Sequence, residues 1–189
     1  MKATLALASL VFLLFSCIPQ KEVYSDYSFN SDFNTYQTFS FVSNHYELGN
    51  PDQELVPYFE KYIRQRMEAQ GYRFTDKQPD LLINYRFYAD DFNLQASHQP
   101  KINKWVKESC NPELMEDGYE LHEQKLRKGA VLISFYDNQS QKHVWQGYST
   151  GQLSNKKEID LRYLKASVNQ IFNEYQLLAN GYLASARKD

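Results

Sequence analysis

The chain contains few of the features that mark several large protein classes. Only 2 of its 189 residues are cysteine, too few for a disulfide framework, and 7 glycines and 6 prolines exclude collagen-like and linker-dominated chains. No apolar run reaches the roughly 18–20 residues of a transmembrane helix. The formal net charge of −2 lacks the positive excess that attracts nucleic-acid phosphates. No nucleic-acid partner is therefore expected.

Apolar and aromatic residues, by contrast, are plentiful. Hydrophobic residues make up 42% of the chain and aromatic residues 15%, mostly as 15 tyrosines and 12 phenylalanines. This composition is sufficient for a buried core. The length corresponds to about one domain, since a typical domain has roughly 150 residues.

Residues 1–16 have the features of a secretory signal. A lysine precedes an apolar stretch that ends at Phe15, and a small residue, Ser16, precedes Cys17. Residues 14–17 resemble the bacterial lipobox, in which the cysteine thiol is acylated and the signal is cleaved just before it. The resemblance implies Cys17 as the lipidation site. An ordinary signal peptide that happens to contain a cysteine is the alternative.

The lipobox resemblance also implies a membrane partner, reached through a lipid anchor. A diacylglyceryl group and an N-acyl chain on Cys17 would supply more than one lipid chain, as stable anchoring requires. The next residue is Ile18, not the aspartate that signals inner-membrane retention in many Gram-negative lipoproteins. We therefore expect an outer-membrane protein that faces the periplasm, with surface exposure as the other arrangement. Residues 17–22 form the lipidated tether.

Hydrophobic spacing predicts one folded domain over residues 23–180, followed by a C-terminal tail over 181–189. Apolar residues recur at three- and four-residue spacing in two segments, which is typical of amphipathic helices. The first helix begins as late as Val56 and ends before Gly71, a glycine suited to the position after a helix. The second helix opens at Asp160.

Alternation of apolar and polar residues predicts strands between these helices. The predicted strands are 23–29, 36–42, 80–88, 129–137 and 142–153, of which the last two form a hairpin through the polar loop 138–141. Residues 97–128 are charged and form an excursion, with short helix-like pieces around Trp105 and over 121–126. The fold class is therefore α+β: a two-layer sandwich with a mainly antiparallel sheet and two amphipathic helices packed on one face.

Three blocks of sequence resemble a known family. The blocks are 26–33 with 36–39, the helix 53–70 with Gly71, Tyr72 and 79–85, and 129–137 with 144–148. In this order they are similar to the domain-of-unknown-function 4136 family of bacterial lipoproteins, although Gln146 stands where arginine is more usual. The resemblance implies an envelope lipoprotein with an α+β fold, and it supplies no catalytic residues.

The sharpest catalytic match is the G-x-S-x-G string from Gly147 to Gly151. That motif needs a strained strand-to-helix turn that exposes the serine, and in the α/β-hydrolase order a histidine follows it. Here the strand-like alternation continues to Leu153, and the last histidine is His143. A strand end with two glycines is therefore favoured over a nucleophile.

Other catalytic and metal-binding patterns are weak. The four histidines are scattered without metal-ligand spacing, so no metal and no cofactor are expected: His45, His98, His122 and His143. Three carboxylates near predicted strand ends show no spacing that argues for a glycosidase pair: Asp90, Asp91 and Asp137. No catalytic residue is therefore assigned.

A group of amphipathic side chains falls on the face of the sheet that points away from the helices. Strand alternation predicts that this face carries Arg86, Tyr88, Tyr136 and Tyr148, and exposed tyrosines favour contacts with a protein or a sugar. Alternatively, the tyrosines pack against the 97–128 excursion or the N-terminal strand. Trp105 has the same two interpretations.

The sequence therefore favours a non-enzymatic envelope lipoprotein that binds an envelope protein or a cell-wall partner through this face. A hydrolase acting on a cell-envelope polymer is the alternative. Cys110 is interpreted as a small buried hydrophobic residue, with a reactive or intermolecular thiol as the alternative.

Overall fold

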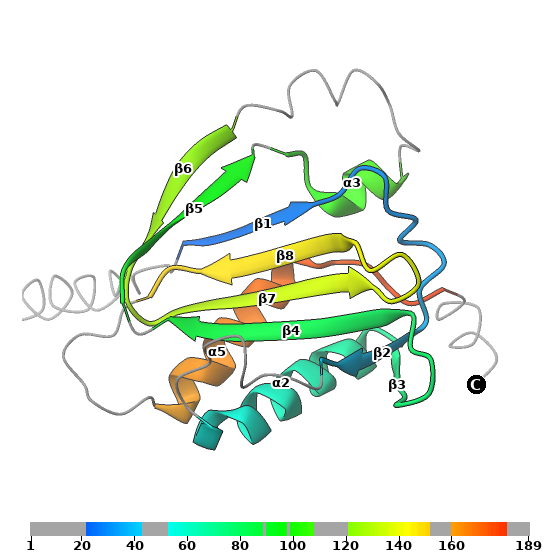
Figure 1. Cartoon of the computed structure of the whole chain (residues 1–189), viewed down its shortest axis with the longest axis horizontal. Coiled ribbons are helices and arrows are strands. Elements are labelled where there is room, and N and C mark those ends of the chain that lie inside the picture. The colour runs from blue at the N-terminus through cyan, green and yellow to red at the C-terminus, as the bar shows by residue number, and fades with distance from the viewer. Residues whose placement is uncertain are drawn as a thin grey trace, which may run out of the picture.

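The computed structural model describes residues 22–42, 53–88, 90–97, 99–107, 121–151 and 160–180. They form a six-stranded sheet, a separate two-stranded ribbon and three α-helices (Figure 1). The elements are β1 (Val23–Tyr27), β2 (Thr38–Phe41), a 3-10 turn (Gln53–Leu55), α2 (Val56–Ala69), β3 (Arg73–Phe74), β4 (Leu81–Tyr88), β5 (Phe92–Ser97), α3 (Ile102–Lys107), β6 (Leu121–Leu126), β7 (Ala130–Asp137), β8 (His143–Ser149) and α5 (Leu161–Glu174). Within these ranges, no helix is long and apolar enough to cross a membrane.

The main sheet has the strand order β1-β8-β7-β4-β2-β3 and is mixed. The first four strands pair antiparallel, whereas β2 pairs parallel to both β4 and β3. The prediction of a mainly antiparallel sheet is therefore wrong. The cause is the helix α2 between β2 and β3, because a helical crossover returns the chain in its original direction and allows parallel pairing. The α+β class itself is confirmed.

The boundaries predicted for the two long helices, the start and end of the first and the start of the second, agree with the structure. Pro57 lies in the first turn of α2, where its missing amide hydrogen breaks no helical bond. The helix ends in a Schellman motif: Gly71 has a φ of 87°, and the Tyr72 amide donates to the Met67 carbonyl at 3.0 Å. Asp160 caps α5, since its carboxylate accepts a bond from the Arg162 amide at 2.8 Å.

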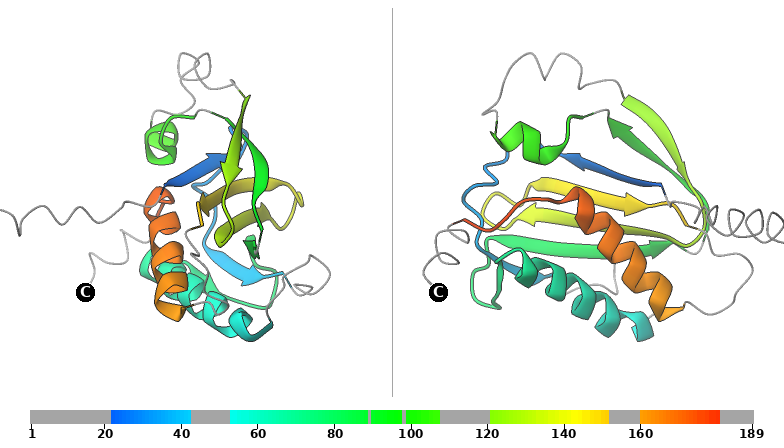
Figure 2. Two further views of the ribbon diagram at one scale, coloured as in Figure 1. Left: turned by 90° about the vertical axis from the view of Figure 1, so that its left-hand side faces the viewer. Right: turned by 180° about the vertical axis from the view of Figure 1, so that it is seen from behind.

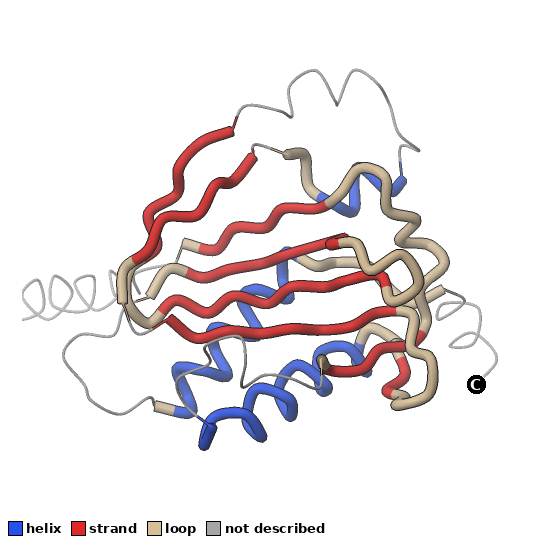
Figure 3. The backbone as a smooth tube through the Cα atoms, viewed as in Figure 1, coloured by secondary structure: helices blue, strands red, loops and turns tan. Residues whose placement is uncertain are grey.

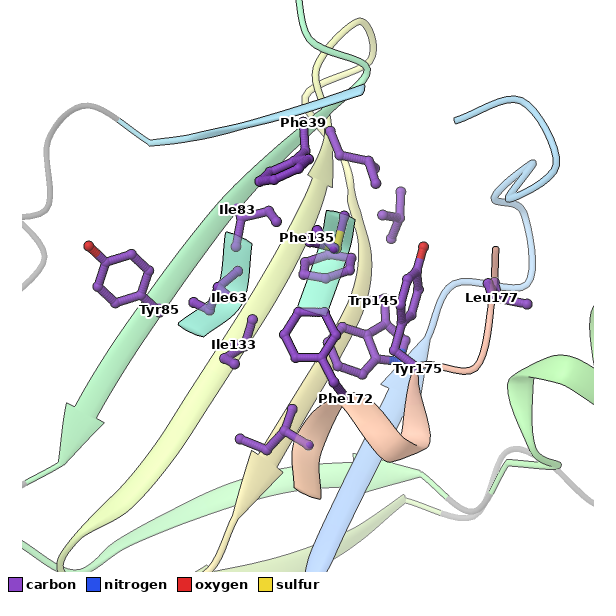
Figure 4. Close-up of a cluster of buried hydrophobic side chains, with 14 of the residues drawn as sticks. Phe39, Ile63, Ile83, Tyr85, Ile133, Phe135, Trp145, Phe172, Tyr175 and Leu177 are labelled. Carbon is purple, nitrogen blue, oxygen red and sulfur yellow. The ribbon is translucent and has the colours of Figure 1, made fainter. Parts of the chain in front are cut away.

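The two helices lie side by side on one face of the main sheet (Figure 2), and the core fills the space between them and the strands. Aromatic rings dominate this core (Figure 4). Phe135 lies 4.8 Å from Trp145 and 4.9 Å from Tyr175 between ring centroids, and Phe172 packs beside them. Alternating inward residues of β4 and β7 complete it, as the sequence predicts: Leu81, Ile83, Tyr85, Phe87, Val131, Ile133 and Phe135.

The segment between β4 and β7 forms a two-stranded antiparallel ribbon, β5–β6, that leaves one end of the main sheet. In Figure 2 the ribbon lies away from α2 and α5. The prediction of a helix-like piece over 121–126 is wrong, because this segment is paired as a strand with β5. The helical piece around Trp105 is confirmed as α3.

At the edge strand β1, a side-chain amide pairs with the outer backbone groups of one residue. The Tyr27 amide donates to Gln99 Oε1 at 2.7 Å, and Gln99 Nε2 donates to the Tyr27 carbonyl at 2.8 Å. The side-chain amide of Gln99 thus takes the place of a neighbouring strand at this point. From β1 the chain runs past the end of the sheet to β2, close to the opposite edge (Figure 3).

Asp80 fixes the start of β2 against β4. Its Oδ2 accepts bonds from the amides of Gln37 and Thr38 and from the Thr38 hydroxyl, each at 2.8 Å, and its own amide donates to that hydroxyl. One carboxylate therefore satisfies the backbone at the point where the parallel pairing begins.

Replacing this carboxylate is expected to destabilise the domain. Asp80→Ala should lower the free energy of unfolding by about 2–3 kcal/mol, because hydrogen bonds to a charged group contribute about 1.5–3 kcal/mol and two amides lose their acceptor. Urea unfolding followed by circular dichroism measures this. The control is Asp76→Ala, which removes an exposed carboxylate from the bend before β4. Equal stability of the two variants would contradict the assignment.

Candidate binding site on the open face of the sheet

The face of the main sheet opposite the helices carries all four residues of the predicted binding face. Cross-strand pairing places Arg86 opposite Leu132, Tyr88 opposite Ala130, and Tyr148 opposite Leu132. The alternation in the sequence therefore assigned these side chains to the correct face.

The ribbon β5–β6 divides this face into a covered part and an open part. Tyr148 is only 1% exposed and stacks on Tyr24 of β1, with ring centroids 5.6 Å apart. Tyr88 stacks on Phe92 of the ribbon. Tyr148 thus packs against the N-terminal strand, as the alternative interpretation expected, whereas the partner of Tyr88, Phe92, lies before the predicted excursion 97–128. Arg86 and Tyr136 remain on the open part.

The open part forms a cavity of about 470 Å³, which we call the sheet cavity. This volume is within the range of roughly 300–1,000 Å³ typical of small-molecule sites. Of the described residues that line it, Arg86 alone is charged. The lining comprises Val42, Leu82, Asn84, Tyr85, Arg86, Leu132, Ser134, Tyr136, Gln141 and Gln146.

A polar row crosses the floor of the sheet cavity. Asn84 of β4 pairs with Ser134 of β7, and Ser134 pairs with Gln146 of β8. Because neighbouring strands lie about 4.8 Å apart, the three side chains span about 10 Å across the sheet. Strand alternation puts Asn84 and Ser134 on the same face as Arg86 and Tyr136, but their alignment with Gln146 depends on strand register.

Asn84 is the least satisfied member of the polar row. It is 9% exposed, and its Oδ1 is buried without a hydrogen-bond partner among the described residues. Burying an unpaired amide group costs about 1–3 kcal/mol, so a ligand that bonds to Asn84 would offset a cost already present in the folded chain.

Asp26 holds the far end of the polar row. Its Oδ2 accepts a bond from Gln146 Nε2 at 3.1 Å, and its Oδ1 accepts a bond from the Ser97 amide at 3.2 Å. Asp26 thus orients Gln146 and ties the end of β5 to β1. Both of its oxygens are engaged, and it does not line the sheet cavity.

Two titratable side chains beside the site are shifted towards their neutral forms. Burial lowers the pKa of His143, and the negative charge of Asp26 opposes that shift. Burial raises the pKa of Tyr148, and Asp26 and Tyr24 raise it further. Neither side chain lines the described part of the sheet cavity, so these shifts do not alter its lining.

The catalytic patterns weighed from the sequence do not assemble. Ser149 is fully buried within β8, so it is not presented on an exposed turn. Gly151 approaches the backbone of residues 127–129 so closely that an added Cβ would overlap it, which explains the second glycine of the string. Asp137 pairs with Leu81 at the start of β4, at the opposite end of that strand from Asp90 and Asp91.

The remaining candidates fall in several places. Trp105 is 3% exposed and packs edge-on against Phe29 at 4.5 Å between centroids, so its packing role is confirmed. His122 lies on the ribbon strand β6. Four candidates lie outside the described residues: Cys17, His45, His98 and Cys110.

Comparison with solved structures gives distant matches. A PDZ domain protein from Parabacteroides distasonis aligns over 94% of this chain at 14% identity with a TM-score of 0.50, and this chain covers 41% of that protein's length. Two structures of a PelC dodecamer from Paraburkholderia phytofirmans align at 8% and 10% identity with TM-scores of 0.46 and 0.43. They cover 84% and 85% of this chain, which covers 98% and 100% of theirs. The first match supports the fold alone.

Comparison of sequences is more specific. No curated protein matches the chain. The sequence model of a family described as "Domain of unknown function (DUF4136)" matches residues 23–175, which include every element from β1 to α5.

Proposed function

Because the chain belongs to the DUF4136 family, a family defined without an activity, we propose its role from its own residues. The protein is an outer-membrane lipoprotein, anchored by Cys17 and facing the periplasm. It acts as a non-enzymatic binding module, and the sheet cavity holds an envelope ligand. The observation that carries this proposal is the cavity itself, a polar site in which the buried Oδ1 of Asn84 has no hydrogen-bond partner among the described residues.

The lipid anchor would keep the sheet close to the membrane. β1 begins at Val23, so the tether 17–22 is at most about 20 Å long even when fully extended. The sheet end that holds Val23 also holds the ends of β4 and β8, since Val23 pairs with Ser149 and Tyr88 pairs with Ala130. This end therefore faces the bilayer in the proposed arrangement, with the open face standing beside it.

The packing around the sheet supports binding rather than catalysis. Conformational cost on binding is low when the site is built on rigid strands. The polar row and Arg86 project from β4, β7 and β8, the central strands of the main sheet. Ser149, the side chain best matched to a catalytic motif, lies within β8 and is fully buried.

The anchor is tested by removing its thiol. Cys17→Ser is expected to abolish acylation, so that the variant is recovered without detergent, whereas the parent protein requires detergent for extraction from outer-membrane fractions. Mass spectrometry of the mature N-terminus reads the lipid directly. Cys110→Ser, which removes the chain's other thiol, is the matched control and should behave like the parent. An unmodified Cys17 in the exported parent protein would refute the anchor.

A further inference from the structure

The side chains of the sheet cavity form three levels along the strands. Arg86 and Leu132 form the first level, Asn84, Ser134 and Gln146 form the second, and Leu82 and Tyr136 form the third. Successive levels are two residues apart on the same face and thus about 7 Å apart. The cavity therefore runs from a cation, through hydrogen-bonding groups, to an aromatic ring.

The second level requires a ligand that can both donate and accept hydrogen bonds. The Asn84 side chain forms no hydrogen bond to the described residues, and its buried Oδ1 lacks a donor. Gln146 commits its Nε2 to Asp26, which leaves Oε1 as its free acceptor. Hydroxyl groups satisfy such a set because each donates one bond and accepts others. A phosphate dianion or a purely apolar ligand would leave the carbonyl oxygens unpaired.

The first level suits an anion. No carboxylate of the described residues forms an ion pair with Arg86, and none lines the sheet cavity. A planar guanidinium binds carboxylates through two parallel hydrogen bonds, which makes this pairing stronger than a neutral one. The absence of a described internal partner leaves this fork available to a ligand.

The third level provides an amphipathic ring. Tyr136 is partly exposed, lines the cavity and is held edge-on to His143 at 5.4 Å between ring centroids. Tyrosine offers an apolar surface with a polar tip, at low conformational cost. Such a surface suits the C–H face of a sugar ring.

We propose that the sheet cavity binds a carboxylated sugar unit of an envelope polysaccharide. Arg86 holds the carboxylate, the polar row of Asn84, Ser134 and Gln146 bonds the hydroxyls, and Tyr136 packs against the ring. This inference rests on the proposed binding function and gives its ligand a chemical class. A protein partner is the competing occupant.

A pair of probes, one with ionised carboxylates and one with the same carboxyl groups methyl-esterified, tests the proposal. Trigalacturonate and its fully methyl-esterified form are titrated calorimetrically into the full-length protein in detergent. The acid is expected to bind at least about tenfold more tightly than the ester, because only the acid pairs with Arg86. Equal affinities, or binding of the ester alone, would overturn the inference.

Single substitutions in the sheet cavity test which side chain makes each contact with the sugar. Arg86→Gln should weaken binding of the acid about tenfold and leave binding of the ester unchanged, whereas Asn84→Ala should weaken both. Arg127→Gln, which removes an exposed cation from the turn before β7, is the matched control and should leave both affinities unchanged. An Arg86→Gln variant that binds the acid as tightly as the parent would refute the role of Arg86.

A photo-crosslinking residue at position 136 separates this inference from the proposed function. If neither sugar binds and the crosslinker joins the cavity to an envelope protein in cells, the sugar inference is wrong and the binding function stands. If the sugars fail and no crosslink forms, both are wrong. Binding of the acid that is blocked by the residue introduced at position 136 supports both.

Discussion

Above a pH of about 10, the domain is expected to lose stability steeply, since an unfolded chain ionises its tyrosines there. Burial raises the pKa of five tyrosines that are each at most 5% exposed: Tyr27, Tyr36, Tyr72, Tyr148 and Tyr175. Burial raises the pKa of Tyr72 to about 12, although its hydrogen bond with Tyr175 opposes the shift. Burial also raises the pKa of Tyr175 well above 10.

The direction of the pH effect on the free energy of unfolding depends on whether the folded or the unfolded state retains its tyrosine protons. Below pH 10 both states are protonated, and the full stability is present. Above it the unfolded chain releases protons that the folded chain retains, so the free energy of unfolding falls by about 1.4 kcal/mol per pH unit for each buried tyrosine. The contribution of Tyr72 continues to fall until its own pKa, about 12, is reached.

Urea midpoints measured from neutral pH to a pH of about 11 test this. Tyr72→Phe should reduce the loss per pH unit, whatever it does to stability at neutral pH. Tyr58→Phe removes a tyrosine that is 39% exposed and should leave the loss unchanged. The same loss per pH unit in Tyr72→Phe and in the parent would show that Tyr72 titrates normally.

Gly151→Ala is expected to lower the free energy of unfolding by about 3 kcal/mol or more. The added Cβ would overlap the carbonyl oxygens of Lys128 and Arg127, and no side-chain rotation can relieve a clash with backbone. Overpacking typically costs about 1–3 kcal/mol where side chains can adjust, so a backbone clash belongs at or beyond the upper end. Thermal unfolding of the purified variant measures the loss.

Ser149→Ala is the matched variant at the same strand end. Ser149 is fully buried and its Oγ has no hydrogen-bond partner in the part of the chain that the structure describes, so removing the hydroxyl should leave stability unchanged or raise it by about 1 kcal/mol. Together the two variants decide what the G-x-S-x-G string does. A destabilised Ser149→Ala and a tolerated Gly151→Ala would reverse the packing explanation.

The sequence predicted the elements that depend on local chemistry. The alternation from Leu81 to Tyr88 gave the correct face for each residue, because side chains in a strand alternate whatever the strand pairs with. Likewise Gly71 and Asp160 marked helix boundaries through caps that involve only neighbouring residues. Membership of the family was also confirmed.

Features that depend on distant partners were not predictable in the same way. β2 is inserted between β4 and β3, and nothing in residues 36–42 specifies a parallel neighbour that lies forty residues further on. Only the pairing of β5 with β6 shows that residues 121–126 form a strand.

The candidate site shows the same division. Arg86 and Tyr136 were found by alternation alone, and they line the sheet cavity. Tyr88 and Tyr148 lie on the predicted face, but the ribbon and β1 provide their stacking partners, Phe92 and Tyr24. The polar row was missed because Asn84, Ser134 and Gln146 become neighbours only through the register of three strands.

The pairing of Gln99 with the backbone of β1 affects how readily copies of the domain could associate through their sheet edges. Unpaired edge strands are templates for polymerisation between copies, and tethering to a surface raises the frequency of encounters. At Tyr27 both outward backbone groups are occupied by Gln99, and at the opposite edge β3 contributes only Arg73 and Phe74. Among the described residues, these two features reduce the number of backbone groups that either edge offers for strand pairing between copies.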